Sequence, residues 1–153
     1  MTTTHTVLQE GMSAPEFTLP SSEGKPVTLS QWRGTAVVLY FYPQDDTPGC
    51  TREACDFRDQ WSALQARGAI LLGVSADSPA SHRQFQQKYQ LPFVLLSDAD
   101  GAVAHQYGVW NEAGYARRAT FVIGPDGRLR RIFPKVQVDG HAAAVLDALA
   151  PAA

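Results

Sequence analysis

The sequence contains few cysteines, no long apolar run and no excess of positive charge. Its 13 Lys and Arg residues and 15 Asp and Glu residues leave a net charge of -2. That balance argues against a nucleic-acid-binding protein held by a strong positive field. The longest apolar run, residues 36–42, is far shorter than the ~20 residues that a membrane-spanning helix needs. We therefore expect no nucleic-acid partner and no membrane span.

The N-terminus also lacks the features of a secretory signal, because residues 1–6 contain neither a basic region nor an apolar one. Without an export signal, Cys50 and Cys55 are better explained as free, metal-bound or catalytic thiols than as a structural disulfide. With 153 residues, 44% of them hydrophobic, the chain suffices for one domain with a sizeable core. We expect one soluble cytoplasmic domain spanning residues 1–153, with a flexible segment at residues 1–11.

Alternating and continuous apolar patterns indicate the expected strands. Residues 15–29 alternate around a polar turn, which predicts an N-terminal β-hairpin or two short edge strands. Residues 36–42 are continuously apolar and β-rich, which is typical of a central strand covered on both faces. Further strands are expected at residues 69–74, 94–96, 119–123 and 128–133.

The expected helices follow from an apolar period near 3.6 residues. Apolar residues alternately four and three positions apart predict one amphipathic helix from Cys50 to Leu64, closed by Gly68. The pair Ser78-Pro79 opens a polar helix that continues to about residue 89. Shorter helices are expected at residues 100–107 and 140–149. Strands that alternate with helices, followed by a hairpin and a last helix, predict an α/β fold with a central mixed β-sheet flanked by helices.

The segment 43–55, which reads P-Q-D-D-T-P-G-C-T-R-E-A-C, joins the expected central strand to the first helix. In open sheets the carboxyl ends of the strands are where ligands bind. Thr47 suits the N-cap and Pro48 the first helical position, so Cys50 falls in the first turn. Free N–H groups and the helix dipole at that position favour a thiolate over a thiol.

Two features oppose a thiolate at Cys50. The residue lies on the apolar stripe of the helix, and burial disfavours the charged form of a thiol. Acidic residues also outnumber basic ones between positions 45 and 59. A reactive thiolate therefore requires a cation from elsewhere in the fold, and the C-terminal part of the chain offers Arg117, Arg118, Arg128, Arg130, Arg131 and Lys135.

The block F-Y-P-x-D-D-T-P-G-C-T-x-E-A-C-x-F-R-D closely resembles the peroxiredoxins, specifically the Q-type or bacterioferritin comigratory protein group. Three further blocks extend the resemblance over nearly the whole chain: G-M-x-A-P-E-F-T-L, G-V-S-A-D-S-P and R-x-T-F-V-I-x-P-D-G. The resemblance implies a thioredoxin-like fold and the reduction of hydrogen peroxide and organic hydroperoxides.

The resemblance also assigns roles to both cysteines. Cys50 takes the peroxidatic position, and Cys55 takes the resolving position found in one branch of the group. The implied cycle forms a sulfenic acid on Cys50, which Cys55 resolves as an intramolecular disulfide. Thioredoxin or a glutaredoxin-like dithiol then reduces that disulfide. The resemblance implies no cofactor and no metal, and a monomer or weak dimer.

Four other residues match the family's site. Thr47 and Pro43 take the two upstream positions of the motif, and Glu53 takes a position that holds an arginine in place. Arg118 takes the arginine position because it stands two residues before Thr-Phe. Strand alternation agrees, since it places Arg118 on one face of the strand and Arg117 on the other.

One departure from the family lies between the pair Val109-Trp110 and Arg118. The connecting segment is several residues shorter than is usual in relatives. That loop lies near the rim of the active site in the family. The preferred size of substrate, and any oligomer contact there, are therefore left open.

The sequence leaves other interpretations of the cysteines and of the function open. Cys55 could be a spectator thiol. A zinc site is disfavoured because four residues separate the cysteines and the histidines are isolated. All four histidines are expected at the surface or in helix caps: His5, His82, His105 and His141. A thioredoxin-like electron carrier would rely on C-x-x-C, and a non-catalytic holdase is a third possibility. Only a peroxidase consumes excess hydroperoxide with a thiol donor.

Overall fold

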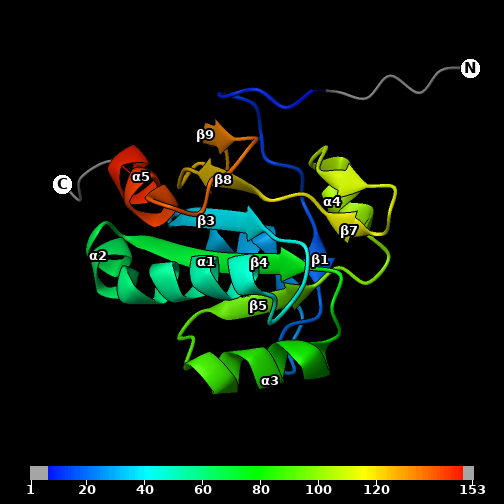
Figure 1. Ribbon diagram of the computed structural model, residues 1–153. Helices are drawn as coiled ribbons and strands as arrows, with labels where there is room; N and C mark the ends of the chain where they lie inside the picture. The colour runs from blue at the N-terminus through cyan, green and yellow to red at the C-terminus, as the bar shows by residue number, and fades with distance from the viewer. Residues whose placement is uncertain (1–6, 150–153) are drawn as a thin grey trace, which may run out of the picture.

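A five-stranded mixed sheet forms the centre of the computed structural model, which describes residues 7–149 (Figure 1). The strands are β3 (Ala36–Phe41), β4 (Ala69–Ser75), β5 (Val94–Ser97), β8 (Ala119–Ile123) and β9 (Leu129–Phe133). Their order is β5-β4-β3-β8-β9, so the strand predicted to be central lies in the middle. β3 pairs in parallel with β4 and antiparallel with β8. The predicted mixed sheet is confirmed.

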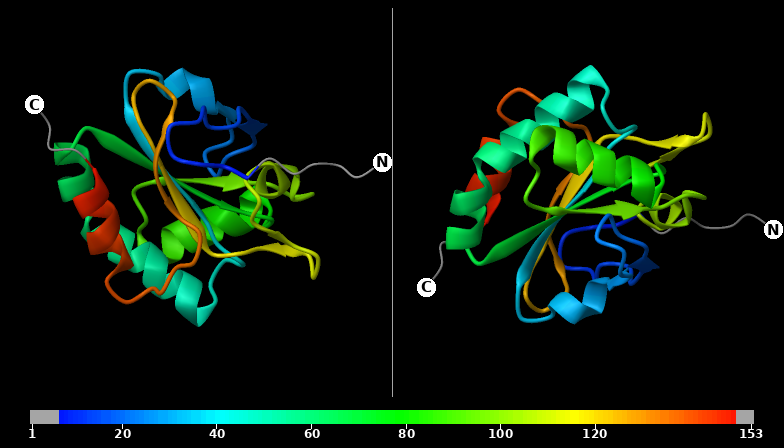
Figure 2. Two further views of the ribbon diagram at one scale, coloured as in Figure 1. Left: turned by 90° about the horizontal axis from the view of Figure 1, so that it is seen from above. Right: turned by 90° about the horizontal axis from the view of Figure 1, so that it is seen from below.

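Helices and short strands cover both faces of the sheet. The helices are α1 (Pro48–Asp59), α2 (Trp61–Ala66), α3 (Pro79–Tyr89), α4 (Ala102–Gln106) and α5 (His141–Ala148), with a 3-10 helix at Leu29–Trp32. One buried cluster joins Val38 and Tyr40 of β3 to α1, α2, α3 and α5. The other joins Leu39 and Phe41 to α4 and the N-terminal segment. Figure 2 shows α1, α2 and α5 together on one side. Both faces of β3 are therefore buried, which explains its continuous apolar sequence.

Two pairs of very short strands lie outside the main sheet. β1 (Thr18–Leu19) pairs antiparallel with β2 (Val27–Thr28), which confirms the N-terminal hairpin. β6 (Trp110–Asn111) pairs with β7 (Tyr115–Ala116), a hairpin that the sequence did not predict. Strands of two residues are too short to show alternation. This second hairpin lies in the segment between Trp110 and Arg118 that is expected to be shorter than in relatives.

The predicted single helix from Cys50 to Leu64 is wrong in one respect, because it is split into α1 and α2. Gln60, between them, has φ -96 and ψ 5, outside the helical region. Phe57 before the break and Leu64 after it are both fully buried in the same cluster. The apolar period therefore predicted the buried face correctly but contained no signal for the break.

The expectation that the histidines lie at the surface or in caps is wrong for two of them. His82 and His141 are buried, at 0% and 6% exposure. Burial, assisted by the charge of Arg118, lowers the pKa of His141 to about 4, so this ring is neutral at neutral pH. His105 is exposed as expected, and His5 lies outside the described residues.

The predicted flexible segment, residues 1–11, falls partly outside the described chain, since residues 1–6 are not included. Near its end, the N–H of Gly11 donates to the carbonyl of Leu129 at 2.7 Å. None of the helices described between residues 7 and 149 has the length and apolar character needed to cross a membrane.

Candidate active site

The loop from β3 to α1 turns sharply before the helix begins. Asp46 has φ 58, in the left-handed region that few residues other than glycine adopt. Thr47 follows with extended backbone at the N-cap position, and Pro48 is the first residue of α1. Cys50 therefore lies in the first helical turn, where the sequence placed it.

Pro43 and Thr47 lie at the two ends of this loop, and both are half-buried. The Thr47 side chain does not cap the helix. Its Oγ1 donates instead to the carbonyl of Gln44 at 3.0 Å, which closes the loop on itself. The predicted roles of Pro43 and Thr47 toward a substrate stay predictions.

Three of the predicted residues meet in a buried cluster. The guanidinium of Arg118 donates from Nη2 to Sγ of Cys50 at 3.3 Å and from Nη1 to Oε1 of Glu53 at 2.6 Å. Cys50 and Glu53 are 2% and 1% exposed. They stand three positions apart, so they share a face of α1. One cation thus faces both the thiol and the carboxyl group.

The neighbouring arginine has a different partner. Arg117 is exposed, and its Nη2 donates to the carbonyl of Trp110 at 3.4 Å. Thr120, two positions after Arg118, is fully buried next to His141, with 2.8 Å between Oγ1 and Nε2. Arg118 is therefore the arginine that contacts the thiol.

The charges of this cluster depend on one another. Burial raises the pKa of Glu53 to about 7, although Arg118 acts in the opposite direction. Burial also works to lower the pKa of the Arg118 guanidinium, but Glu53 and Cys50 outweigh it and raise that pKa above its usual value. Arg118 therefore remains a cation beside the sulfur.

Two buried polar atoms on this side of the sheet have unused hydrogen-bonding capacity. Within residues 7–149, the hydroxyl of Tyr40 and Oε2 of Glu53 find no partner. Burial, followed by the charges of Glu53 and Cys50, raises the pKa of Tyr40 well above its usual value, so its hydroxyl keeps its proton. Sequence reasoning missed Tyr40, because its position in an apolar strand gave no polar signal.

Cys55 lies on the same helix as Cys50 and is half-buried, and both cysteines are free. Burial raises the pKa of the Cys55 thiol, only partly opposed by Arg58. Five residues of α-helix advance about 7.5 Å. A disulfide needs Cα atoms within about 6.8 Å and facing side chains. The two sulfurs therefore cannot bond while α1 is intact.

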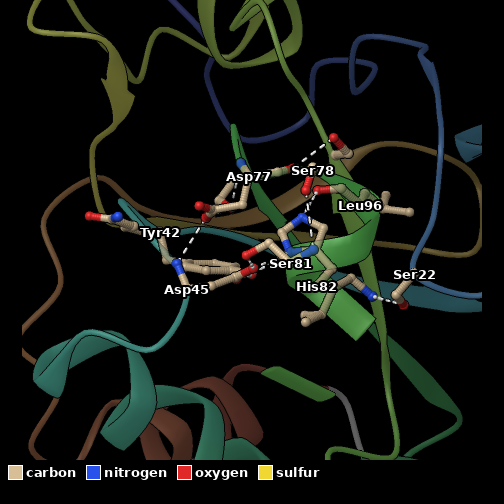
Figure 3. Close-up of polar contacts among 12 residues, drawn as sticks. Ser22, Tyr42, Asp45, Asp77, Ser78, Ser81, His82 and Leu96 are labelled. Carbon is tan, nitrogen blue, oxygen red and sulfur yellow. Dashed lines mark hydrogen bonds and ion pairs between the residues drawn. The ribbon is translucent and has the colours of Figure 1, made fainter. Parts of the chain in front are cut away.

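A second polar cluster, also missed by sequence reasoning, lies beside the loop (Figure 3). Asp45, Asp77 and His82 bring their ligand-type atoms within 4.8 Å of one another. These ligand-type atoms form hydrogen bonds with protein groups. For example, Oδ2 of Asp45 lies 2.7 Å from Nδ1 of His82. These residues are up to 37 positions apart, so no local pattern could join them.

The sequence is similar to known proteins over nearly its whole length. The model of the AhpC/TSA family matches residues 11–132. A relative from Coxiella burnetii is 50% identical over 93% of this chain and 99% of its own length. Peroxiredoxin Bcp of Bacillus subtilis is 41% identical over 93% of this chain and 95% of its own length.

Solved structures agree in fold. The bacterioferritin comigratory protein of Xanthomonas campestris superposes with a TM-score of 0.85 at 38% identity, over 92% of this chain and 97% of that one. This similarity to a thioredoxin-fold peroxiredoxin confirms the expected fold. With Arg118 held against Cys50 in the first turn of α1, the chain belongs to the AhpC/TSA family, as a peroxiredoxin of the Bcp and peroxiredoxin Q group.

Proposed function

We propose that this protein is a thiol-dependent peroxidase that reduces hydrogen peroxide and organic hydroperoxides at Cys50. The observation that carries the proposal is the 3.3 Å contact between the Arg118 guanidinium and the buried sulfur of Cys50 at the start of a helix. The helix end and the cation both stabilise a thiolate, the nucleophilic form of the thiol. The Xanthomonas campestris relative is described by its alkyl peroxide reduction activity.

In the first step the thiolate of Cys50 attacks one oxygen of the hydroperoxide, and the O–O bond breaks. The attacked oxygen stays on sulfur as a sulfenic acid, and the other oxygen leaves as hydroxide or alkoxide, which takes up a proton. Negative charge thus moves from sulfur to the leaving oxygen. Arg118 and the free N–H groups of the first turn are fixed donors for that charge.

In the second step Cys55 resolves the sulfenic acid. Its thiolate attacks the sulfur of Cys50, a disulfide forms and the sulfenic oxygen leaves as water after protonation. A dithiol partner then reduces the disulfide in two exchange steps. We propose thioredoxin or a glutaredoxin-like protein for this role. A monomeric or weakly dimeric state and a cytoplasmic location stay predictions.

The direct test is a coupled assay with thioredoxin, thioredoxin reductase and NADPH. We expect NADPH oxidation that depends on hydroperoxide, with many equivalents consumed per chain. Hydrogen peroxide and a bulky organic hydroperoxide should be compared in the same assay. The assay should be repeated with a small dithiol as the electron donor. An electron carrier or a holdase would consume no excess hydroperoxide under these conditions. Absence of hydroperoxide consumption would therefore reject the proposal.

Gly49 makes room for the Arg118 guanidinium. A Cβ at this position would lie 3.2 Å from Nη2 of Arg118, closer than an ordinary contact. We expect Gly49→Ala to displace the guanidinium from Cys50 and to slow peroxide reduction about tenfold. This corresponds to an increase of about 1.4 kcal/mol in the activation free energy. Stopped-flow oxidation of the reduced protein would measure this, with Gly49→Ser giving a larger loss. A normal rate in both variants would show that the close approach is unimportant.

The positions of the cysteines predict a change of structure during the cycle. Because Cys50 and Cys55 cannot bond within an intact helix, the first turns of α1 must unwind after the sulfenic acid forms. We expect fast amide exchange over residues 47–56 in the disulfide form and clear protection in the reduced form. The buried Phe57 should hold the rest of the helix.

Hydrogen–deuterium exchange with mass analysis of the two redox forms is the measurement. α3, which contains no cysteine, serves as the internal control and should exchange equally in both. Equal protection of residues 47–56, with the Cys50–Cys55 bond verified within one chain, would contradict the unwinding.

A further inference from the structure

His82 is completely buried, and both of its ring nitrogens have partners (Figure 3). Nδ1 lies 2.7 Å from Oδ2 of Asp45, and Nε2 lies 2.9 Å from the carbonyl oxygen of Leu96 on β5. The ring therefore connects the Asp45 carboxylate to the backbone of the sheet.

Asp45 is held by more than His82. The hydroxyl of Tyr42 donates to its Oδ1 at 2.6 Å, and the hydroxyl of Ser81 donates to its Oδ2 at 2.8 Å. The backbone N–H of Asp45 donates to the carboxylate of Asp77 at 2.8 Å. Both the side chain and the backbone of this loop residue are therefore fixed against α3 and the end of β4.

The next loop residue is also bound to α3. The carboxylate of Asp46 accepts from Nζ of Lys88 and from the hydroxyl of Tyr89, each at 2.7 Å. Its φ of 58 is the turn that sends the chain back toward α1. Asp46 is exposed whereas Asp45 is buried, and exposed ion pairs contribute little. The buried contacts of Asp45, that with His82 among them, therefore hold the loop more strongly than the exposed contacts of Asp46.

We propose that His82 is a positioning residue for Cys50. Through Asp45 it fixes the turn of the 43–47 loop that presents Cys50 to Arg118, and it keeps this turn in place while the first turn of α1 unwinds. The hinge then lies at residues 47–49, after the attached part of the loop. The inference rests on the proposed peroxidase function and extends it to α3, which holds none of the predicted catalytic residues.

The test measures, by stopped flow, the rate at which a hydroperoxide oxidises Cys50 once in each reduced protein. We expect His82→Gln and Asp45→Asn each to slow oxidation of Cys50 by on the order of 10- to 100-fold, the effect of a small displacement of a reacting group. The double variant should be no slower than the slower single variant, because the two residues act through one contact. The same substitution at the exposed His105, His105→Gln, should leave the rate within about twofold.

A second readout separates positioning from general destabilisation. In reduced His82→Gln, amides of residues 43–50 should exchange faster while those of β3 and β4 stay protected. If His82→Gln does not fold, Ser81→Ala removes one donor from the same carboxylate oxygen and decides the question by the same rate. Unchanged oxidation rates, or strictly additive losses in the double variant, would overturn the proposal. If the wild-type protein itself leaves Cys50 unoxidised, the proposed function fails instead.

Discussion

Replacing Cys50 by serine is expected to abolish multiple-turnover peroxidase activity. A serine hydroxyl is a much weaker nucleophile than a cysteine thiol, so no effective nucleophile would face the peroxide. The burial and helical position of residue 50 are unchanged by the substitution, and the fold should be retained. The coupled assay should therefore fall to the rate without enzyme.

Cys55→Ser is the matched control for that experiment, because it changes the same atom five positions along the same helix. It should retain one turnover per chain, accumulate sulfenic acid on Cys50 and lose recycling by thioredoxin. Substantial turnover in Cys50→Ser would remove Cys50 from the peroxidatic position.

Arg118→Ala should slow the reaction with peroxide by about 100- to 1,000-fold, the range for removal of one fixed donor to a developing oxyanion. The variant loses the guanidinium contact to Cys50 Sγ and leaves the buried Glu53 without its cation. Stopped-flow oxidation of the reduced variant by a hydroperoxide would measure this loss.

Arg117→Ala provides the control, since Arg117 is exposed and its guanidinium contacts the Trp110 carbonyl. It should change the rate within about twofold, as expected for an exposed charge. The rate of Arg118→Lys should lie between those of the two alanine variants. Lysine keeps the positive charge, but it lacks the planar guanidinium that contacts Cys50 and Glu53 at the same time. Equal losses in Arg117→Ala and Arg118→Ala would contradict the assignment.

Much of the site could be predicted because its signals are local. The Thr47-Pro48 pair predicts where α1 begins, and therefore the turn on which Cys50 lies. Strand alternation distinguishes Arg118 from Arg117. The same holds for β3, whose apolar run reports burial on both faces. In these cases the physical cause of the structure lies within a few neighbouring residues, so a local sequence pattern can predict it.

The remaining features depend on contacts between distant segments. The burial of His82 follows from partners on the loop and on β5, 37 and 14 positions away. The break at Gln60 leaves the apolar stripe intact, so the period gives no sign of it. The unpartnered atoms of Tyr40 and Glu53 arise from packing alone. None of these features has a signature in the neighbouring sequence.

The peroxidatic role of Cys50 is best tested by locating the oxygen atom that the hydroperoxide transfers in one turnover. Reduced Cys55→Ser protein would be mixed with one equivalent of an organic hydroperoxide, treated with a sulfenic-acid trapping reagent and mapped by mass spectrometry. We expect one trapped sulfenic acid per chain, on Cys50, together with one equivalent of the alcohol. Consumption of the hydroperoxide with Cys50 unmodified, or no consumption by a folded protein, would contradict that role.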